Sequence, residues 1–217
     1  MKKVIQYVNF GLLNFLCLDI NLVIIYIVWV NYCNDPWAPN IFQLSKSHLV
    51  MELFVLRHGE AGKSIPSGSS DSKRPLTVAG ERELIIISRA LRKMGVRLDV
   101  ILTSPLKRAR QTADIVAKEF KAQNKIQQLR ELSPEGNKKA IYQNLSSFKE
   151  GTSILLVGHS PYLSEMVSEI VTDETSLRLD LKKGGIVRIR VTAAAPKLKG
   201  ELRWLITPRL SRLISKS

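Results

Sequence analysis

The chain has 217 residues, of which 45% are hydrophobic and 24% charged. This length fits one globular domain with an appendage, and the composition excludes a wholly disordered or collagen-like chain. Two cysteines, Cys17 and Cys33, and three histidines exclude a disulfide framework and a cysteine-rich zinc site. The first 50 residues hold three basic and two acidic side chains, so +13 of the net charge of +14 belongs to residues 51–217. That excess favours anionic partners, although general solubility accounts for it equally well.

The first 50 residues differ in character from the rest. Residues 4–30 are largely apolar, and residues 11–30 form the best window for a membrane span, with Asp19 near its centre. A central aspartate costs about 2.5–3.5 kcal/mol on the insertion scale. Residues 1–50 are therefore either a weak membrane anchor, an extension produced by a mis-assigned start before Met51, or a segment with another role. We expect a cytoplasmic monomer, with a membrane as partner only if this anchor is genuine.

From Met51 onward, apolar strand patterns alternate with helical patterns. Strands are predicted over residues 52–56, 100–103, 153–157 and 202–206, and helices over 79–94, 104–120, 138–148 and 160–171. Thr77 and Ser104 are predicted to cap the first two helices, and residues 61–73, rich in glycine and serine, are predicted to form a loop. Residues 177–181 and 186–191 flank a turn and are predicted to pair as antiparallel strands. This alternation predicts an α/β fold of three α/β/α layers, in which helices cover both faces of a mainly parallel sheet. We expect a domain over residues 51–210 and a basic tail over 211–217.

Three of the predicted strands end in unusual residues. They are followed by Arg57-His58-Gly59, by Ser104-Pro105 leading to Arg108, and by Gly158-His159-Ser160. Ligands of such sheets bind outside the carboxyl ends of the strands. A neutral imidazole is a competent nucleophile, arginines and helix N-termini hold phosphate oxygens, and a protonated second histidine would add a positive donor. Each residue alone could be structural, and Arg110 is expected to be a surface charge, but together they predict phosphoryl transfer without a metal.

Four segments resemble, in order and spacing, the signature blocks of the histidine phosphatase superfamily, which has the phosphoglycerate mutase-like fold. They are Leu56-Arg57-His58-Gly59-Glu60-Ala61, the block from Arg74-Pro75-Leu76-Thr77 to Gly80, the block from Ser104-Pro105 to Gln111-Thr112, and Val157-Gly158-His159-Ser160-Pro161. The resemblance covers about residues 51–210 and is strongest to the short SixA-type phosphohistidine phosphatases.

The resemblance implies roles for individual residues. His58 would be the nucleophile that becomes phosphohistidine, with Arg57, Arg108 and His159 forming the phosphate pocket. Arg74 would be a further phosphate ligand, and Gly59 and Ser160 would belong to the substrate-binding blocks. No metal or other cofactor is implied. Larger relatives carry a glutamate acid in a long insertion, whereas the short loop over residues 127–137 offers Glu131, Glu135 or neither.

Three functions remain open on this basis. The first is a protein phosphohistidine phosphatase of the SixA type, whose partner is a phosphorylated protein carrying a phosphohistidine domain. The second is a phosphatase acting on small phosphomonoesters. The third is an anion-binding module without catalysis. Nucleic acid is not expected as a partner, because aromatic residues are not interleaved with the basic ones.

Overall fold

The computed structural model describes residues 51–62, 70–193 and 197–216. The alternatives for residues 1–50 therefore concern a segment outside the described part of the chain. Within the described part, no helix combines the length and the apolar character needed to cross a bilayer.

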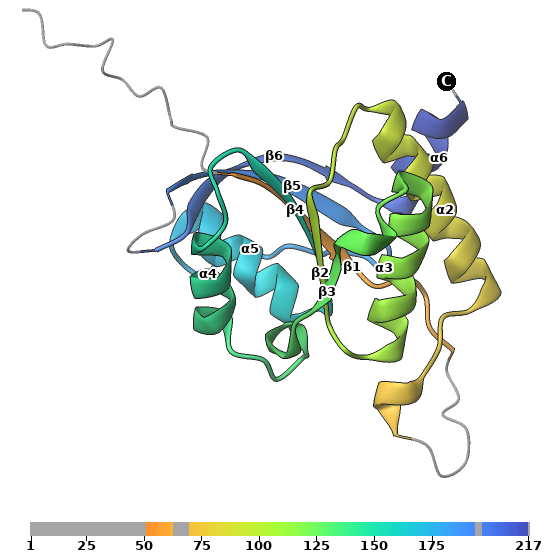
Figure 1. The fold of residues 1–217 in the computed structure, drawn as a ribbon, viewed down its shortest axis with the longest axis horizontal. Coiled ribbons are helices and arrows are strands. Elements are labelled where there is room, and N and C mark those ends of the chain that lie inside the picture. Colours follow the sequence, from red (N-terminus) through yellow and green to blue (C-terminus); the bar gives the residue numbers. More distant parts are fainter. Residues whose placement is uncertain (1–50, 63–69, 194–196, 217) are drawn as a thin grey trace, which may run out of the picture. The chain divides into compact units, whose positions relative to one another are not determined.

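A six-stranded sheet forms the centre of the domain (Figure 1). Its strands are β1 (Met51–Arg57), β2 (Val100–Thr103), β3 (Ile126–Gln128), β4 (Thr152–Gly158), β5 (Ile186–Ala193) and β6 (Lys199–Ile206), in the spatial order β3-β2-β4-β1-β5-β6. The first four strands in that order run parallel, whereas β5 and β6 are antiparallel to their neighbours. The predicted α/β fold with a mainly parallel sheet is confirmed. Arg57 lies opposite Gly158, so β1 and β4 end at the same level.

Helices cover both faces of the sheet. On one side lie α4 (Lys138–Ser146) and α5 (Tyr162–Thr172), and on the other α2 (Val78–Lys93), α3 (Lys107–Phe120) and α6 (Pro208–Lys216) (Figure 1). Three short 3-10 turns, η2 (Asp71–Lys73), η3 (Gln123–Lys125) and η4 (Arg130–Leu132), lie in the connections. Residues 211–217 were expected to be a tail, but as far as Lys216 they belong to α6, which packs along α2.

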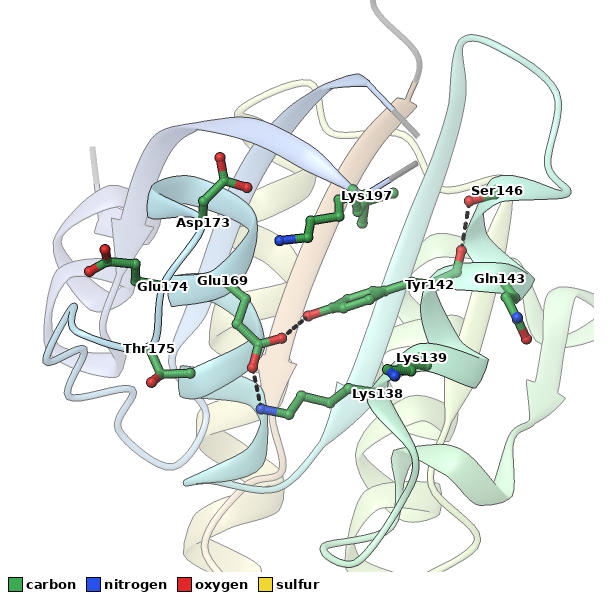
Figure 2. Close-up of a pocket in the computed structure, with 11 residues that line it drawn as sticks. Lys138, Lys139, Tyr142, Gln143, Ser146, Glu169, Asp173, Glu174, Thr175 and Lys197 are labelled. Atoms are coloured by element: carbon green, nitrogen blue, oxygen red, sulfur yellow. Dashed lines mark hydrogen bonds and ion pairs between the residues drawn. The ribbon is translucent and has the colours of Figure 1, made fainter. Parts of the chain in front are cut away.

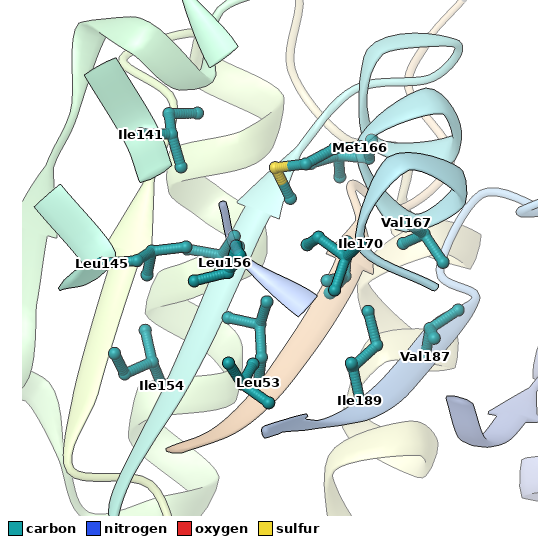
Figure 3. Close-up of a cluster of buried hydrophobic side chains, with 14 of the residues drawn as sticks. Leu53, Ile141, Leu145, Ile154, Leu156, Met166, Val167, Ile170, Val187 and Ile189 are labelled. Atoms are coloured by element: carbon teal, nitrogen blue, oxygen red, sulfur yellow. The ribbon is translucent and has the colours of Figure 1, made fainter. Parts of the chain in front are cut away.

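Each face of the sheet has its own hydrophobic core, because successive side chains of a strand point to opposite faces. Leu53 and Leu156 lie in the core beneath α4 and α5, together with Met166 and Ile170 (Figure 3). Their neighbours Phe54 and Leu155 lie in the other core, against α2 and α3. Strands buried on both faces require continuous apolar runs. That requirement accounts for the pattern by which β1 and β4 were predicted.

The structure corrects two of the predicted elements. Residues 177–181 are not a strand, because β5 bonds to β1 on one side and to β6 on the other, which leaves no strand for the segment to pair with. Helix α3 begins at Lys107 rather than at Ser104. The Ser104 N–H donates to the Val157 carbonyl, so Ser104 still belongs to the sheet ladder.

Two further elements were not predicted. Strand β3 was assigned in part to a loop, since only Ile126 of its three residues is apolar and half-buried. Helix α6 was not predicted, although Pro208 begins it and Leu210, Leu213 and Ile214 recur at helical spacing. The start of α2 was predicted correctly, since the Thr77 side chain accepts the Gly80 N–H.

Candidate active site

The two histidines of the described chain meet at the carboxyl ends of neighbouring parallel strands. His58 follows β1 and His159 follows β4, and their ring centroids are 5.0 Å apart. The backbone N–H of His58 donates to the Gly158 carbonyl, which extends the hydrogen-bond ladder between β1 and β4 by one residue. Ser104, which follows β2, hydrogen-bonds to His159 from the other side of β4. Strand order therefore joins three segments that lie about 50 residues apart in sequence.

Hydrogen bonds determine which nitrogen of His58 carries the proton. The side chain is buried, and its Nδ1 lies 2.7 Å from the carbonyl oxygen of Gly59, which can only accept a hydrogen bond. Nδ1 therefore carries the proton, and Nε2 accepts the Nε–H of Arg108 at 3.3 Å. The lone pair of Nε2 thus points to the buried guanidinium of Arg108, which could hold an anion beside it.

The surroundings of His58 keep its imidazole neutral. Burial lowers the pKa of His58 from 6.5 to about 4, and the positive charges of Arg108, Arg57 and Lys183 act in the same direction, against the hydrogen bond to Gly59. A lowered pKa means that the ring is unprotonated at neutral pH. A neutral imidazole can act as a nucleophile without first losing a proton.

We expect a histidine that titrates far below its ordinary range. In NMR titrations of the folded protein, His58 should stay neutral until the pH falls toward about 4, whereas a histidine of the unfolded chain protonates near 6.5. Between these values the unfolded state binds more protons than the folded state, so stability should fall as the pH is lowered through this window. A His58 midpoint near 6.5 would contradict the pocket described here.

His159 is hydrogen-bonded through Nε2 to a serine hydroxyl. The Ser104 hydroxyl accepts the Leu106 N–H at 3.3 Å and lies 3.0 Å from Nε2 of His159. A hydroxyl that donates to Nε2 leaves the imidazole proton on Nδ1. That Nδ1 is buried and finds no hydrogen-bond partner among the described residues. It is a donor that an anion beside His58 could use.

His159 is a neutral donor in this structure, and not the cation that the sequence analysis considered. Burial lowers the pKa of His159 to about 3, with His58 and Arg108 adding to the shift. The negative charge of Asp71 acts in the opposite direction. A bound phosphoryl group would act in the same sense as Asp71, so phosphate binding and protonation of His159 should favour each other.

Arg57 and Arg108 act on the two histidines, and Arg74 is linked to Arg108 through Asp71. Arg57 donates from Nη1 to the Leu181 carbonyl at 2.8 Å, and its buried Nε has no partner among the described residues. Its charge contributes to the lowered pKa of both histidines. Arg108 and Arg74 are joined by the carboxylate of Asp71, at 3.0 Å from Arg108 Nη1 and 2.9 Å from Arg74 Nη2. Two guanidiniums from separate sequence blocks, those of Arg74 and Arg108, thus share one carboxylate.

Gly59 serves this site through its backbone. Its N–H donates to the Thr112 hydroxyl at 3.2 Å, and its carbonyl accepts from His58. A Cβ at Gly59 would lie 2.7 Å from Leu84 Cδ1, so a larger residue does not fit. Thr112 donates in turn to the Arg108 carbonyl. Gly59 was expected to contact substrate, but in this structure it positions His58 and links β1 to α3.

No side-chain hydrogen bond joins the remaining predicted residues to either histidine in the described chain. The Ser160 hydroxyl bonds to Ser164 of α5 and contacts none of the arginines. Neither Glu131 nor Glu135 has a side-chain hydrogen bond or ion pair within the described ranges, so no contact marks either as the proton donor. Arg110 is exposed and paired with Asp114, as expected of a surface charge.

Sequence reasoning missed three residues of the site: Asp71, Ser104 as a partner of His159, and Thr112 as a support of Gly59. Asp71 was assigned to a loop rich in glycine and serine. A signal was present, because an aspartate three residues before Arg74 can pair with it once the segment turns. Ser104 was interpreted only as a helix cap. No sequence pattern indicates its contact with His159, which depends on β2 lying beside β4.

A separate cavity of about 950 Å³ lies between α4 and α5 (Figure 2). Two of its charged groups are paired with each other, since Glu169 accepts hydrogen bonds from both Lys138 and Tyr142. Neither histidine and none of the three arginines lines this cavity. No cluster of three or more metal-ligating side chains occurs in the parts of the chain that the structure covers. The chemistry is therefore placed at the strand ends and not in the cavity.

Comparison with known proteins identifies relatives of this chain. The histidine phosphatase superfamily (branch 1) matches residues 53–135. The phosphohistidine phosphatase SixA of Escherichia coli is 32% identical over 127 residues, which cover 58% of this chain and 77% of that protein. A solved structure of the protein histidine phosphatase SixA with tungstate has a TM-score of 0.64 at 26% identity, and the match covers 73% of this chain and 98% of that one. A SixA structure from Agrobacterium tumefaciens shares the fold, with a TM-score of 0.61 at 24% identity and coverage of 72% and 97%.

Proposed function

Because the chain belongs to the histidine phosphatase superfamily, and is therefore a phosphatase, we propose that it hydrolyses a phosphohistidine on a protein substrate through a phosphohistidine intermediate on His58. The observation that carries the proposal is the hydrogen bonding of His58. Its Nδ1 proton is held by Gly59 while Nε2 faces Arg108, so a neutral nucleophile lies beside a buried guanidinium.

In the first step, Nε2 of His58 attacks phosphorus, and the bond from phosphorus to the leaving group breaks with its electron pair. Arg57, Arg108 and Arg74 neutralise the phosphoryl oxygens, and His159 Nδ1 donates to one of them. Phosphoryl transfer requires mainly positioning and charge neutralisation, which this set of groups supplies. In the second step, water attacks phosphorus, the bond to Nε2 breaks, and inorganic phosphate leaves while His58 returns to its neutral form.

The leaving group favours phosphohistidine over a phosphoester. A departing alkoxide needs a strong proton donor, and Glu131 and Glu135 have no hydrogen bond or ion pair that would hold either one beside the histidines in the described chain. A departing imidazole can carry its own proton, since its pKa lies near 6.5. The two SixA structures, one a protein histidine phosphatase and the other a putative phosphohistidine phosphatase, are matched over 98% and 97% of their length, so this domain has the size of those proteins.

Hydrolysis of phosphohistidine can be compared directly with hydrolysis of small esters. The full chain is incubated with a protein phosphorylated on histidine, with phosphoserine and with p-nitrophenyl phosphate, and phosphate release is measured. We expect the highest kcat/KM for the phosphohistidine protein, and no release by His58→Ala at the same concentration. A higher kcat/KM for the small esters would favour the second candidate, a phosphomonoester phosphatase. If no substrate is turned over, the result would favour the third candidate, an anion-binding module without catalysis.

A further inference from the structure

The carboxylate of Asp71 already occupies donor positions of the proposed phosphate pocket. One oxygen lies 2.9 Å from Arg74 Nη2 and the other 3.0 Å from Arg108 Nη1. The two carboxylate oxygens of Asp71 are thus held by two different guanidiniums. Two oxygens of a phosphoryl group would be held in the same way. Asp71 therefore contacts the arginines at the positions where substrate oxygens are expected.

The two ends of this contact differ in their exposure to solvent. The Arg108 side chain is 5% exposed, whereas that of Asp71 is 52% exposed. Asp71 begins η2, the short turn that leads to Arg74. Its carboxylate thus reaches the buried guanidinium from the solvent side, where an incoming ligand would also enter. Its charge is also felt by His159, whose pKa it raises against the effect of burial.

We propose that Asp71 is a specificity-determining residue: an internal anion that a substrate phosphoryl group must displace from Arg74 and Arg108. The inference rests on the phosphate pocket of the proposed function. A phosphoryl group carries close to two negative charges and three free oxygens, and it also reaches Arg57, His159 and Nε2 of His58. Asp71 has one charge and two oxygens, so the phosphoryl group replaces it.

Free carboxylates compete with Asp71 for the same two arginines and are kept out of the pocket. A carboxylate attached to the chain acts at a high effective concentration, which a free carboxylate in solution does not match. A singly charged ligand with two oxygens can make only the same contacts with the arginines that Asp71 already makes. Asp71 should therefore exclude carboxylates, which are abundant on protein surfaces and among metabolites, while admitting phosphoryl groups.

The test compares Asp71→Asn and Asp71→Ala with Asp114→Asn in the full chain. Asp114 pairs with exposed Arg110 on α3, so its replacement removes the same charge away from the pocket. Calorimetry gives the affinity for inorganic phosphate, and acetate inhibition is measured during p-nitrophenyl phosphate hydrolysis. Circular dichroism verifies that each variant is folded, which the exposure of both aspartates favours.

We expect both Asp71 variants to bind phosphate about 3–10-fold more tightly, the scale of one partly exposed ion-pair contact. Acetate should inhibit Asp71→Ala competitively and leave the wild type and Asp114→Asn unaffected. Unchanged or weaker phosphate binding by Asp71→Asn would overturn the inference, since Asp71 would then only order the arginines. A wild-type protein that does not bind phosphate at all would instead refute the phosphate pocket itself.

Discussion

Replacing His58 by alanine is expected to lower kcat/KM by about 10³-fold or more, because it removes the atom that forms the bond to phosphorus. The remaining arginines and His159 would still bind an anion, so phosphate affinity should fall far less than turnover. The measurement is hydrolysis of p-nitrophenyl phosphate and of a phosphohistidine protein, with calorimetry of phosphate binding to the same variant. A large loss of rate with binding retained is the signature of a lost nucleophile.

The covalent intermediate provides an independent test of this role. Rapid acid-free quenching of the wild type during turnover, followed by mass spectrometry, should locate a phosphoryl group on His58. Circular dichroism should show that His58→Ala keeps its fold, since the lost side chain lies at the end of β1 and outside the two hydrophobic cores. Activity near the wild-type level, together with no trapped phosphoenzyme, would rule out the covalent mechanism.

Lysine is not expected to perform the function of Arg57 or Arg108. In the structure, Arg108 directs Nε to His58 and Nη1 to Asp71 at the same time, which a single ammonium cannot do. Arg57 uses Nη1 to hold the Leu181 carbonyl while Nε remains free of any partner in the described chain. A planar guanidinium can therefore be anchored and still bind an oxygen, whereas lysine loses one of these contacts. We expect Arg57→Lys and Arg108→Lys each to lower kcat/KM by about 10–10³-fold.

Arg110→Lys is the matched control for these two variants. Arg110 lies two residues after Arg108 on the same helix, but its guanidinium is exposed and paired with Asp114. If the arginines supplied only a general positive potential, all three substitutions would be equally mild, because lysine carries the same charge. Equal and small effects at the three positions would mean that the phosphate pocket has been placed incorrectly.

The parts that could be predicted from sequence are those determined by local pattern. Apolar runs indicated β1 and β4, and Thr77 indicated the start of α2, since burial on both faces and helix capping leave direct traces in neighbouring residues. His58, His159 and Arg108 could be grouped because parallel strands end at one edge of a sheet. Strand β3 left no such trace because it is short, whereas the trace of α6, a proline start and apolar residues at helical spacing, was overlooked.

The state of each site residue was decided only by tertiary structure. Which nitrogen of His58 is free depends on the Gly59 carbonyl, and the tautomer of His159 depends on Ser104, which strand order brings beside it. The sequence left His159 as a possible cation, whereas burial beside His58 and Arg108 makes it neutral. Asp71 joins two arginines that lie 34 residues apart in the chain. Residue types and their order along the chain therefore determined the kind of chemistry. Packing between distant segments determined the protonation and orientation of the histidines and the position of the Asp71 carboxylate, because burial and hydrogen bonding exist only in the folded state.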